Sequence, residues 1–183
     1  MVDSQLRPSG VNARFVLERM LTVAREDHVP AEARAIAYMD RAVPLGGGRF
    51  LPAPVVQGMM LEEADPRPSD QALVVDGGSG YLAELLRPMV GTLAVVSPDE
   101  AARGESATGP FSLILIDGAV EHVPAPLAAL LAPEGRLVTG LVEQGVTKLA
   151  AGQLAGEAVA LLPLAELGIP VLPQFARARA WTF

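Results

Sequence analysis

The stretch that most constrains the fold is residues 73–86, LVVDGGSGYLAELL. An apolar run of β-type residues passes into the turn Gly77-Gly78-Ser79-Gly80 and then into a leucine-rich helical pattern. Such a strand, turn and helix form one unit of a parallel sheet, and the glycines with the free N–H groups of the helix start suit an anionic ligand. A tight turn that only packs strand against helix fits the residues equally well, so both interpretations stay open.

The rest of the chain repeats this texture. Continuous apolar runs separated by helical patterns indicate a parallel sheet covered on both faces. We expect strands at 72–76, 92–97, 111–117 and 135–142, helices at 79–89 and 124–132, and antiparallel edge strands within 147–155, 158–165 and 178–183. The fold class is α/β, with a doubly wound, mostly parallel sheet.

An N-terminal helical layer precedes the sheet. We expect a helix over 12–26 with Asn12 as N-cap, a second over 30–39 opened by Pro30, and a third starting at Pro54, joined by a glycine-rich hairpin or loop over 42–54. The length suits one domain, 1–183, in which 1–66 form the helical and loop region and 67–183 the sheet region.

One connection is too short. Only residues 98–110 separate the runs 92–97 and 111–117, and this piece is rich in Gly, Ser and Pro. It cannot supply a helix, a strand and a second helix together. We therefore expect the sheet to lack one edge strand, which leaves 92–97 as an apolar edge without Pro or charge. A homodimer through this edge is one way to cover it.

Composition excludes several classes of site and partner. The chain has no cysteine and only two histidines, which excludes thiolate chemistry and argues against any metal site. A net charge of −7 argues against nucleic acid as a partner. No apolar stretch is long enough to span a membrane, and MVDSQLRPSG is unlike a signal peptide, so we expect a soluble, cytoplasmic protein with no membrane partner.

Several long segments, in order, resemble the protein-L-isoaspartate O-methyltransferase family. They are MVDSQLRPSGVNARFVLERMLTVAREDHVP, AYMDRAVPLGGGRFLPAPVVQGMM, ALVVDGGSGYLAELL, FSLILIDGAVEHVPAPLAALLAPEGRLV and IPVLPQFARARAWTF. The resemblance implies a methyltransferase-like (Rossmann-like) fold and S-adenosylmethionine as cofactor. It also implies methyl transfer to the carboxylate of isoaspartyl residues in damaged proteins, so the partner would be a protein or peptide.

The resemblance also suggests the site residues. It gives cofactor contacts at Asp76, Gly78, Ser79, Gly80 and Tyr81, and a substrate loop with Arg49, Leu51, Pro52 and Pro54. Asp99, just beyond the second strand, is the substitute contact for the ribose-binding acid of the family, and with it the chain would still methylate a carboxylate. Asp117, at the end of a strand, lies where methyltransferase folds present groups to the transferred methyl, although a turn or cap role explains it too. It is the one candidate catalytic residue.

Four departures from the family pattern concern the cofactor site. Val74 stands where relatives carry an acid, unless Asp76 takes that role, and the ribose-binding acid falls on Val96 or Ser97. Pro52 replaces a serine associated with activity, and the short 98–110 connection omits the wall of the adenine pocket. We therefore expect a degraded cofactor site with weakened or lost catalysis. The alternative is a non-catalytic, protein-binding or dimerising domain on the same fold.

Overall fold

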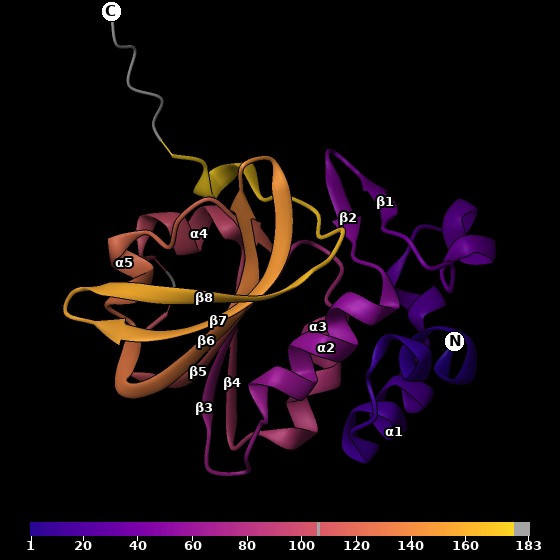
Figure 1. Cartoon of the computed structure of the whole chain (residues 1–183), viewed down its shortest axis with the longest axis horizontal. Helices are drawn as coiled ribbons and strands as arrows, with labels where there is room; N and C mark the ends of the chain where they lie inside the picture. Colours follow the sequence, from indigo (N-terminus) through magenta and orange to yellow (C-terminus); the bar gives the residue numbers. More distant parts are fainter. Residues whose placement is uncertain (106, 178–183) are drawn as a thin grey trace, which may run out of the picture.

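A computed structural model describes residues 1–105 and 107–177 and contains a six-stranded sheet with helices on both faces (Figure 1). The strand order is β4-β3-β5-β6-β7-β8; β4, β3, β5 and β6 are parallel, β7 pairs antiparallel with β6, and β8 pairs antiparallel with β7. The strands are β3 (Gln71–Val75), β4 (Thr92–Val96), β5 (Phe111–Val120), β6 (Leu131–Glu143), β7 (Val146–Ala155) and β8 (Ala158–Glu166). The predicted α/β sheet with antiparallel strands at one edge is confirmed, while the strand candidate 178–183 lies outside the described residues.

Two groups of helices sandwich the sheet. On one face lie α1 (Arg14–Thr22), α2 (Pro54–Ala64) and α3 (Tyr81–Leu86), and on the other face lie α4 (Pro98–Arg103) and α5 (Ala125–Ala128). The predicted glycine-rich hairpin is a separate two-stranded sheet of β1 (Val43–Gly46) and β2 (Arg49–Leu51). Short 3-10 and π turns complete the described chain at Val2–Leu6, Arg7–Ser9, Arg25–His28, Ala31–Ile36, Arg87–Met89 and Pro173–Phe175.

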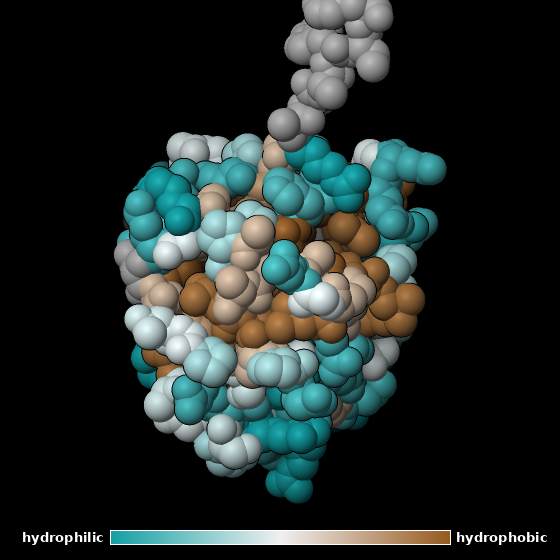
Figure 2. Space-filling view, turned by 90° about the vertical axis from the view of Figure 1, so that its left-hand side faces the viewer, coloured by the Kyte–Doolittle hydropathy of each residue, from teal (hydrophilic) through white to brown (hydrophobic). Residues whose placement is uncertain are grey.

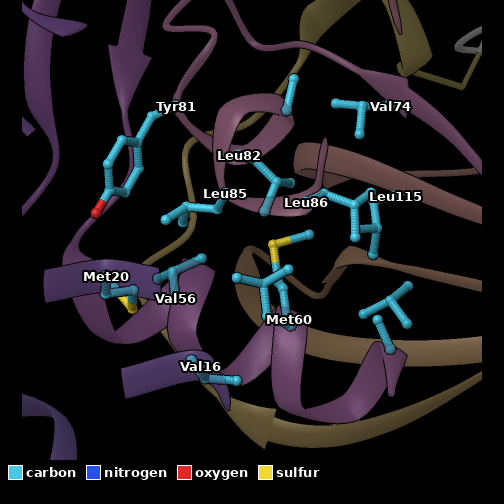
Figure 3. Packing of buried hydrophobic residues seen from close by; sticks show 14 of the residues in the cluster. Val16, Met20, Val56, Met60, Val74, Tyr81, Leu82, Leu85, Leu86 and Leu115 are labelled. Atoms are coloured by element: carbon cyan, nitrogen blue, oxygen red, sulfur yellow. The ribbon is translucent and has the colours of Figure 1, made fainter. Parts of the chain in front are cut away.

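The central strands β3 and β5 bury both of their faces, as continuous apolar runs predict. Successive side chains of β3 and β5 alternate, so that Val74 and Leu115 pack toward α1, α2 and α3, whereas Leu73 and Ile114 pack toward α4 and α5. Figure 3 shows the first of these clusters, where side chains of three helices meet those of the sheet. This double burial fixes the carboxyl ends of β3 and β5 beside each other.

Within residues 1–105 and 107–177, the sheet lacks a strand beyond β4, as the short connection predicts. Only α4 joins β4 to β5, and among the described residues no strand pairs with the outer side of β4. Val95 of this edge is 43% exposed. The edge is therefore open in the monomer, and the homodimer through it stays a prediction.

The first predicted helix is wrong at both ends. It begins at Arg14, and Asn12 does not cap it; Asn12 donates instead to the carbonyl oxygen of Gly10. The free N–H groups of Asn12 and Ala13 donate to the carboxylate of Glu62 in α2, at 3.2 and 2.8 Å. A tertiary contact thus satisfies the helix start, which the local sequence could not indicate.

Three other predicted helices are shorter or tighter than expected. The predicted helix 30–39 is a 3-10 turn that Pro30 precedes, and α3 begins at Tyr81 because Gly80 takes a left-handed conformation. The predicted helix 124–132 ends at Ala128, because Leu131 already pairs with Phe111 in the sheet. Competition from strand pairing, which acts at long range, decided this boundary.

The β8 edge of the sheet carries exposed leucines. The side chains of Leu162 and Leu164 are 66% and 43% exposed. Figure 2 looks at the side of the molecule where α5 and the turn between β7 and β8 lie in Figure 1, and shows an apolar band across its middle. In the described part of the chain, no helix has both the length and the apolar character needed to cross a membrane.

Candidate functional site

A cavity of about 510 Å³ opens at the carboxyl ends of the parallel strands. From β3 the chain leads to β4 on one side, and β5 then pairs with β3 on the other side, so the strand order reverses here. In open α/β sheets, ligands bind in the crevice at such a switch point. The cavity walls come from the glycine turn, the end of β4 with the start of α4, the bend of β5, the β1–β2 hairpin and residues 170–174.

The glycine turn brings bare backbone to the cavity. A Cβ added to Gly77 would lie 2.4 Å from the carbonyl oxygen of Asp117, and one added to Gly78 would lie 2.7 Å from Cδ of Arg49. Asp76 spans the turn, because its Oδ1 accepts a 2.9 Å hydrogen bond from the N–H of Gly80. The turn is therefore a glycine-dependent wall with a carboxylate beside it.

The end of β4 carries no acidic residue at the position where the family pattern suggests a ribose-binding acid. Ser97 caps α4, since its Oγ accepts from the N–H of Glu100 and its own N–H donates to the Glu100 carboxylate. Asp99, two residues further, lines the cavity and accepts a 3.3 Å hydrogen bond from Nε2 of Gln174. The acid and the amide that face the cavity here are thus Asp99 and Gln174.

Asp117 lies at an irregularity of β5. Between the pairs Leu115–Val138 and Ala119–Gly140, β5 uses more residues than β6, and such bulges redirect side chains. The Asp117 side chain is buried, and both of its oxygens accept from Nε2 of Gln57 at 3.1 Å. Burial, and then repulsion by Asp76, raises the pKa of Asp117 to about 7 against the opposing effects of Gln57, Arg25 and Ser79.

A buried arginine, Arg25, contacts Gln57 on the side away from Asp117. Arg25 is fully buried and donates to the carbonyl oxygens of Ala37 and Pro52 and to Oε1 of Gln57. Its guanidinium also lies over the ring of Tyr81, 4.9 Å from the centroid. The result is a continuous buried chain from Arg25 through Gln57 to Asp117.

The predicted substrate loop divides into two parts. Arg49 is exposed and lines the cavity, with its aliphatic part against Gly78. Leu51, Pro52 and Pro54 are buried and do not line it. Pro52 instead contributes its carbonyl oxygen to Arg25, at 2.6 Å.

The structure therefore brings five of the predicted site residues to one cavity: Arg49, Asp76, Gly78, Asp99 and Asp117. Ser79 and Gly80 belong to the same turn, and Tyr81 is buried beneath it. Sequence reasoning missed Gln57, Arg25 and Gln174. The one available signal was Gln57, a polar residue among the apolar positions of a buried helix.

Both histidines are half-buried. His28 contacts the ring of Tyr81 edge to face, and its Nδ1 lies 3.0 Å from the carbonyl oxygen of Ser79. His122 Nδ1 lies 3.0 Å from the carbonyl oxygen of Phe175. Neither lines the 510 Å³ cavity.

Another hollow, of about 970 Å³, lies away from the glycine turn beside the β6–β7 turn. Its two cations are engaged locally: Lys148 pairs with Glu143, and Arg177 donates to the carbonyl oxygen of Glu121. Among the described residues, no three acidic or histidine side chains cluster in a way that could hold a metal ion. The glycine-turn cavity is thus the better candidate for chemistry.

The sequence is similar to those of known proteins of one family. The sequence model of the family Protein-L-isoaspartate(D-aspartate) O-methyltransferase (PCMT) matches residues 1–103. A protein-L-isoaspartate O-methyltransferase of Aeropyrum pernix is 38% identical over 163 residues, which cover 73% of this chain and 63% of the relative. One of Gloeobacter violaceus is 36% identical over 163 residues, which cover 75% of this chain and 79% of the relative.

Solved structures share the fold. A Plasmodium falciparum protein described as a protein-L-isoaspartate O-methyltransferase, in complex with S-adenosyl-L-homocysteine, superposes with a TM-score of 0.71 at 18% identity, covering 92% of this chain and 94% of that chain. A second protein-L-isoaspartate O-methyltransferase gives a TM-score of 0.73 at 14% identity, covering 93% and 64%. The six-stranded sheet described above is therefore a methyltransferase fold.

Proposed function

The chain belongs to the protein-L-isoaspartate O-methyltransferase family, and we propose that it methylates the carboxylate of isoaspartyl residues in proteins with S-adenosylmethionine as methyl donor. The relatives carry the family assignment. The observation that carries the proposal for this chain is the cavity at the switch point, because it retains the volume and the glycine wall that a nucleoside cofactor needs.

The residues of the cavity fit the cofactor. Its volume of about 510 Å³ lies within the usual range of small-molecule sites. The carboxylates of Asp76 and Asp117 suit a ligand with cationic groups, and Gly77 and Gly78 line the cavity beside them. Asp99 and Gln174 would hold ribose hydroxyls in place of the acid that the family pattern puts at Val96 or Ser97.

The chemistry asks little of the protein's acids and bases. S-adenosylmethionine, when bound, supplies an electrophilic methyl group, and a carboxylate is already nucleophilic at neutral pH. The chain then has to align the acceptor and exclude water. Arg49, an exposed cation at the cavity wall, would attract the anionic acceptor.

We expect the affinity for cofactor to be weak, in the millimolar range. Each lost charge-assisted hydrogen bond to a ligand costs roughly 1.5–3 kcal/mol, and Ser97 caps a helix where relatives would offer an acid. The same departure favours the second candidate function, a non-catalytic protein-binding or dimerising domain. The cavity of about 510 Å³ beside the turn supports the enzyme, whereas the Arg49 side chain packed against Gly78 favours the binding domain.

The test measures cofactor binding and methyl-ester formation on the same protein. NMR titration with S-adenosylmethionine and S-adenosylhomocysteine should show saturable shifts at Gly77 and Gly78, and labelled methyl groups should appear as a base-labile ester on an isoaspartyl peptide. The aspartyl peptide of the same sequence and the Asp76→Ala variant are the controls, and neither should give ester. Binding without ester formation at high protein concentration would support the non-catalytic domain instead.

A further inference from the structure

Asp117 has a buried side and a side toward the cavity. On the buried side, Nε2 of Gln57 donates to both carboxylate oxygens at 3.1 Å. On the other side, Asp117 lines the cavity. There Oγ of Ser79 donates to Oδ2 of Asp117 only through a long hydrogen bond of 3.5 Å. A carboxylate can accept about four hydrogen bonds. Accepting capacity therefore remains for a donor that enters the cavity.

The amide of Gln57 can point only one way. Oε1 of Gln57 accepts a 2.8 Å hydrogen bond from Nη1 of Arg25, and an arginine can only donate. The Nε2 group of Gln57 must therefore face Asp117. Gln57 is fully buried in α2, and Arg25 is held in turn by the carbonyl oxygens of Ala37 and Pro52. The direction of the Asp117 carboxylate is thus fixed by two residues that do not line the cavity.

The charges around Asp117 leave it without a direct cationic partner. In the described part of the chain it forms no ion pair, and Arg25 reaches it only through Gln57. The other acidic side chains of the cavity are Asp76, after β3, and Asp99, on α4. His28 contacts the carbonyl oxygen of Ser79 in the glycine turn. The exposed Arg49 forms a long, 3.5 Å hydrogen bond to the carbonyl oxygen of Gly46. A buried carboxylate in this position gains most from a cation supplied by a ligand.

We propose that Asp117 binds the cationic group of the ligand in this cavity and that Gln57, held by Arg25, is the positioning residue that directs the Asp117 carboxylate toward it. The identity of the ligand rests on the proposed function. The relevant group is the ammonium of the amino acid end, which S-adenosylmethionine and S-adenosylhomocysteine share and which 5′-methylthioadenosine lacks.

Binding is then linked to a proton. Burial and Asp76 raise the pKa of Asp117 to about 7, so the free protein carries this carboxyl partly protonated near neutral pH. An ammonium group beside it favours the ionised form, and the proton leaves to solvent. For a group with this pKa, the affinity for S-adenosylhomocysteine should rise roughly eightfold between about pH 6 and pH 7.5.

The experiment is an NMR titration of the full chain with S-adenosylhomocysteine and, separately, with 5′-methylthioadenosine across that range. In the wild type, Kd for the first ligand should fall with pH, and Kd for the second should stay constant. Asp117→Asn should remove the pH dependence and weaken the first ligand about 10- to 100-fold at the upper end, as expected for a charge-assisted hydrogen bond. Gln57→Met should move the profile to higher pH, because Asp117 loses the donor that favours its anion.

Three further variants separate the causes. Asp99→Asn, another carboxylate of the cavity, should keep the pH dependence whatever its affinity. His28→Gln should keep it too, because the pH dependence is assigned to the Asp117 carboxyl. Gln71→Met, an exposed glutamine on β3, should leave the profile unchanged.

The outcomes are distinguishable. Binding of both ligands with a pH-independent Kd for S-adenosylhomocysteine would overturn the inference and leave the proposed function standing. Failure of both ligands to bind would overturn the proposed function and the ligand role of Asp117 together. The ¹³C titration of the Asp117 carboxyl in the free protein decides the role of Gln57 independently, since an unchanged midpoint in Gln57→Met would overturn it.

Discussion

The carboxylate of Asp76 and the backbone N–H of Gly80 are joined by a 2.9 Å hydrogen bond that closes the glycine turn. Asp76 therefore has a structural use besides its predicted role as a cofactor contact. It supplies an acceptor to the start of α3, and its charge reaches Asp117 as well.

Asp76→Ala should destabilise the protein by about 1 kcal/mol, because the Gly80 N–H loses its acceptor as at an uncapped helix start. Asp76→Asn keeps an oxygen acceptor and should cost only a few tenths of that. Urea unfolding of both variants at neutral pH measures the difference. Equal losses would show that charge, and not the hydrogen bond, matters at this turn.

Asp117→Asn should change the pH dependence of stability. The pKa of Asp117 is raised from an unfolded value of about 4 to about 7, so its contribution to stability is complete below about pH 4 and is lost as pH rises through about 7. Relative to wild type, the variant should therefore gain roughly 2–4 kcal/mol between these pH values and level off above. Urea midpoints measured across this range provide the check, and a constant difference would contradict the raised pKa.

Pro52→Ser should not by itself create activity on an isoaspartyl peptide. Pro52 is buried and lies outside the cavity wall, and its carbonyl oxygen, which any residue would provide, accepts from Arg25. The labelled-methyl assay on wild type and variant measures the effect. A strong gain of ester formation in the variant would show that the rest of the site was already competent.

Val95→Lys should yield a monomer if the open edge of β4 pairs with a second copy around a two-fold axis. Val95 is 43% exposed on a strand whose outer side is unpaired among the described residues. Light scattering should then give a dimer for wild type and a monomer for the variant, while Leu162→Lys on the opposite edge should remain dimeric. A wild type that stays monomeric at high micromolar concentration would disprove the pairing.

The sequence by itself determined the sheet and its shortened edge. Apolar runs of strand length, such as 111–117, can only be buried between two layers of helices, and the length of 98–110 excludes another strand and helix. Asp76, Gly78, Asp99 and Asp117 could be named because each lies at or just after the carboxyl end of a predicted strand, and parallel strands end at one edge.

The tertiary structure alone decided which groups complete that edge. Gln57 and Asp117 are 60 residues apart, and Gln174 and Asp99 are 75 apart, so no local pattern relates them. The same holds for Glu62, which replaces the predicted cap Asn12 by reaching across from α2. Hydrogen bonds to buried donors and acceptors must be satisfied by whatever the packing brings near, and packing depends on the whole fold. The chemistry of the cavity was therefore visible in the sequence as separate residues, and only the folded chain joins them into a site.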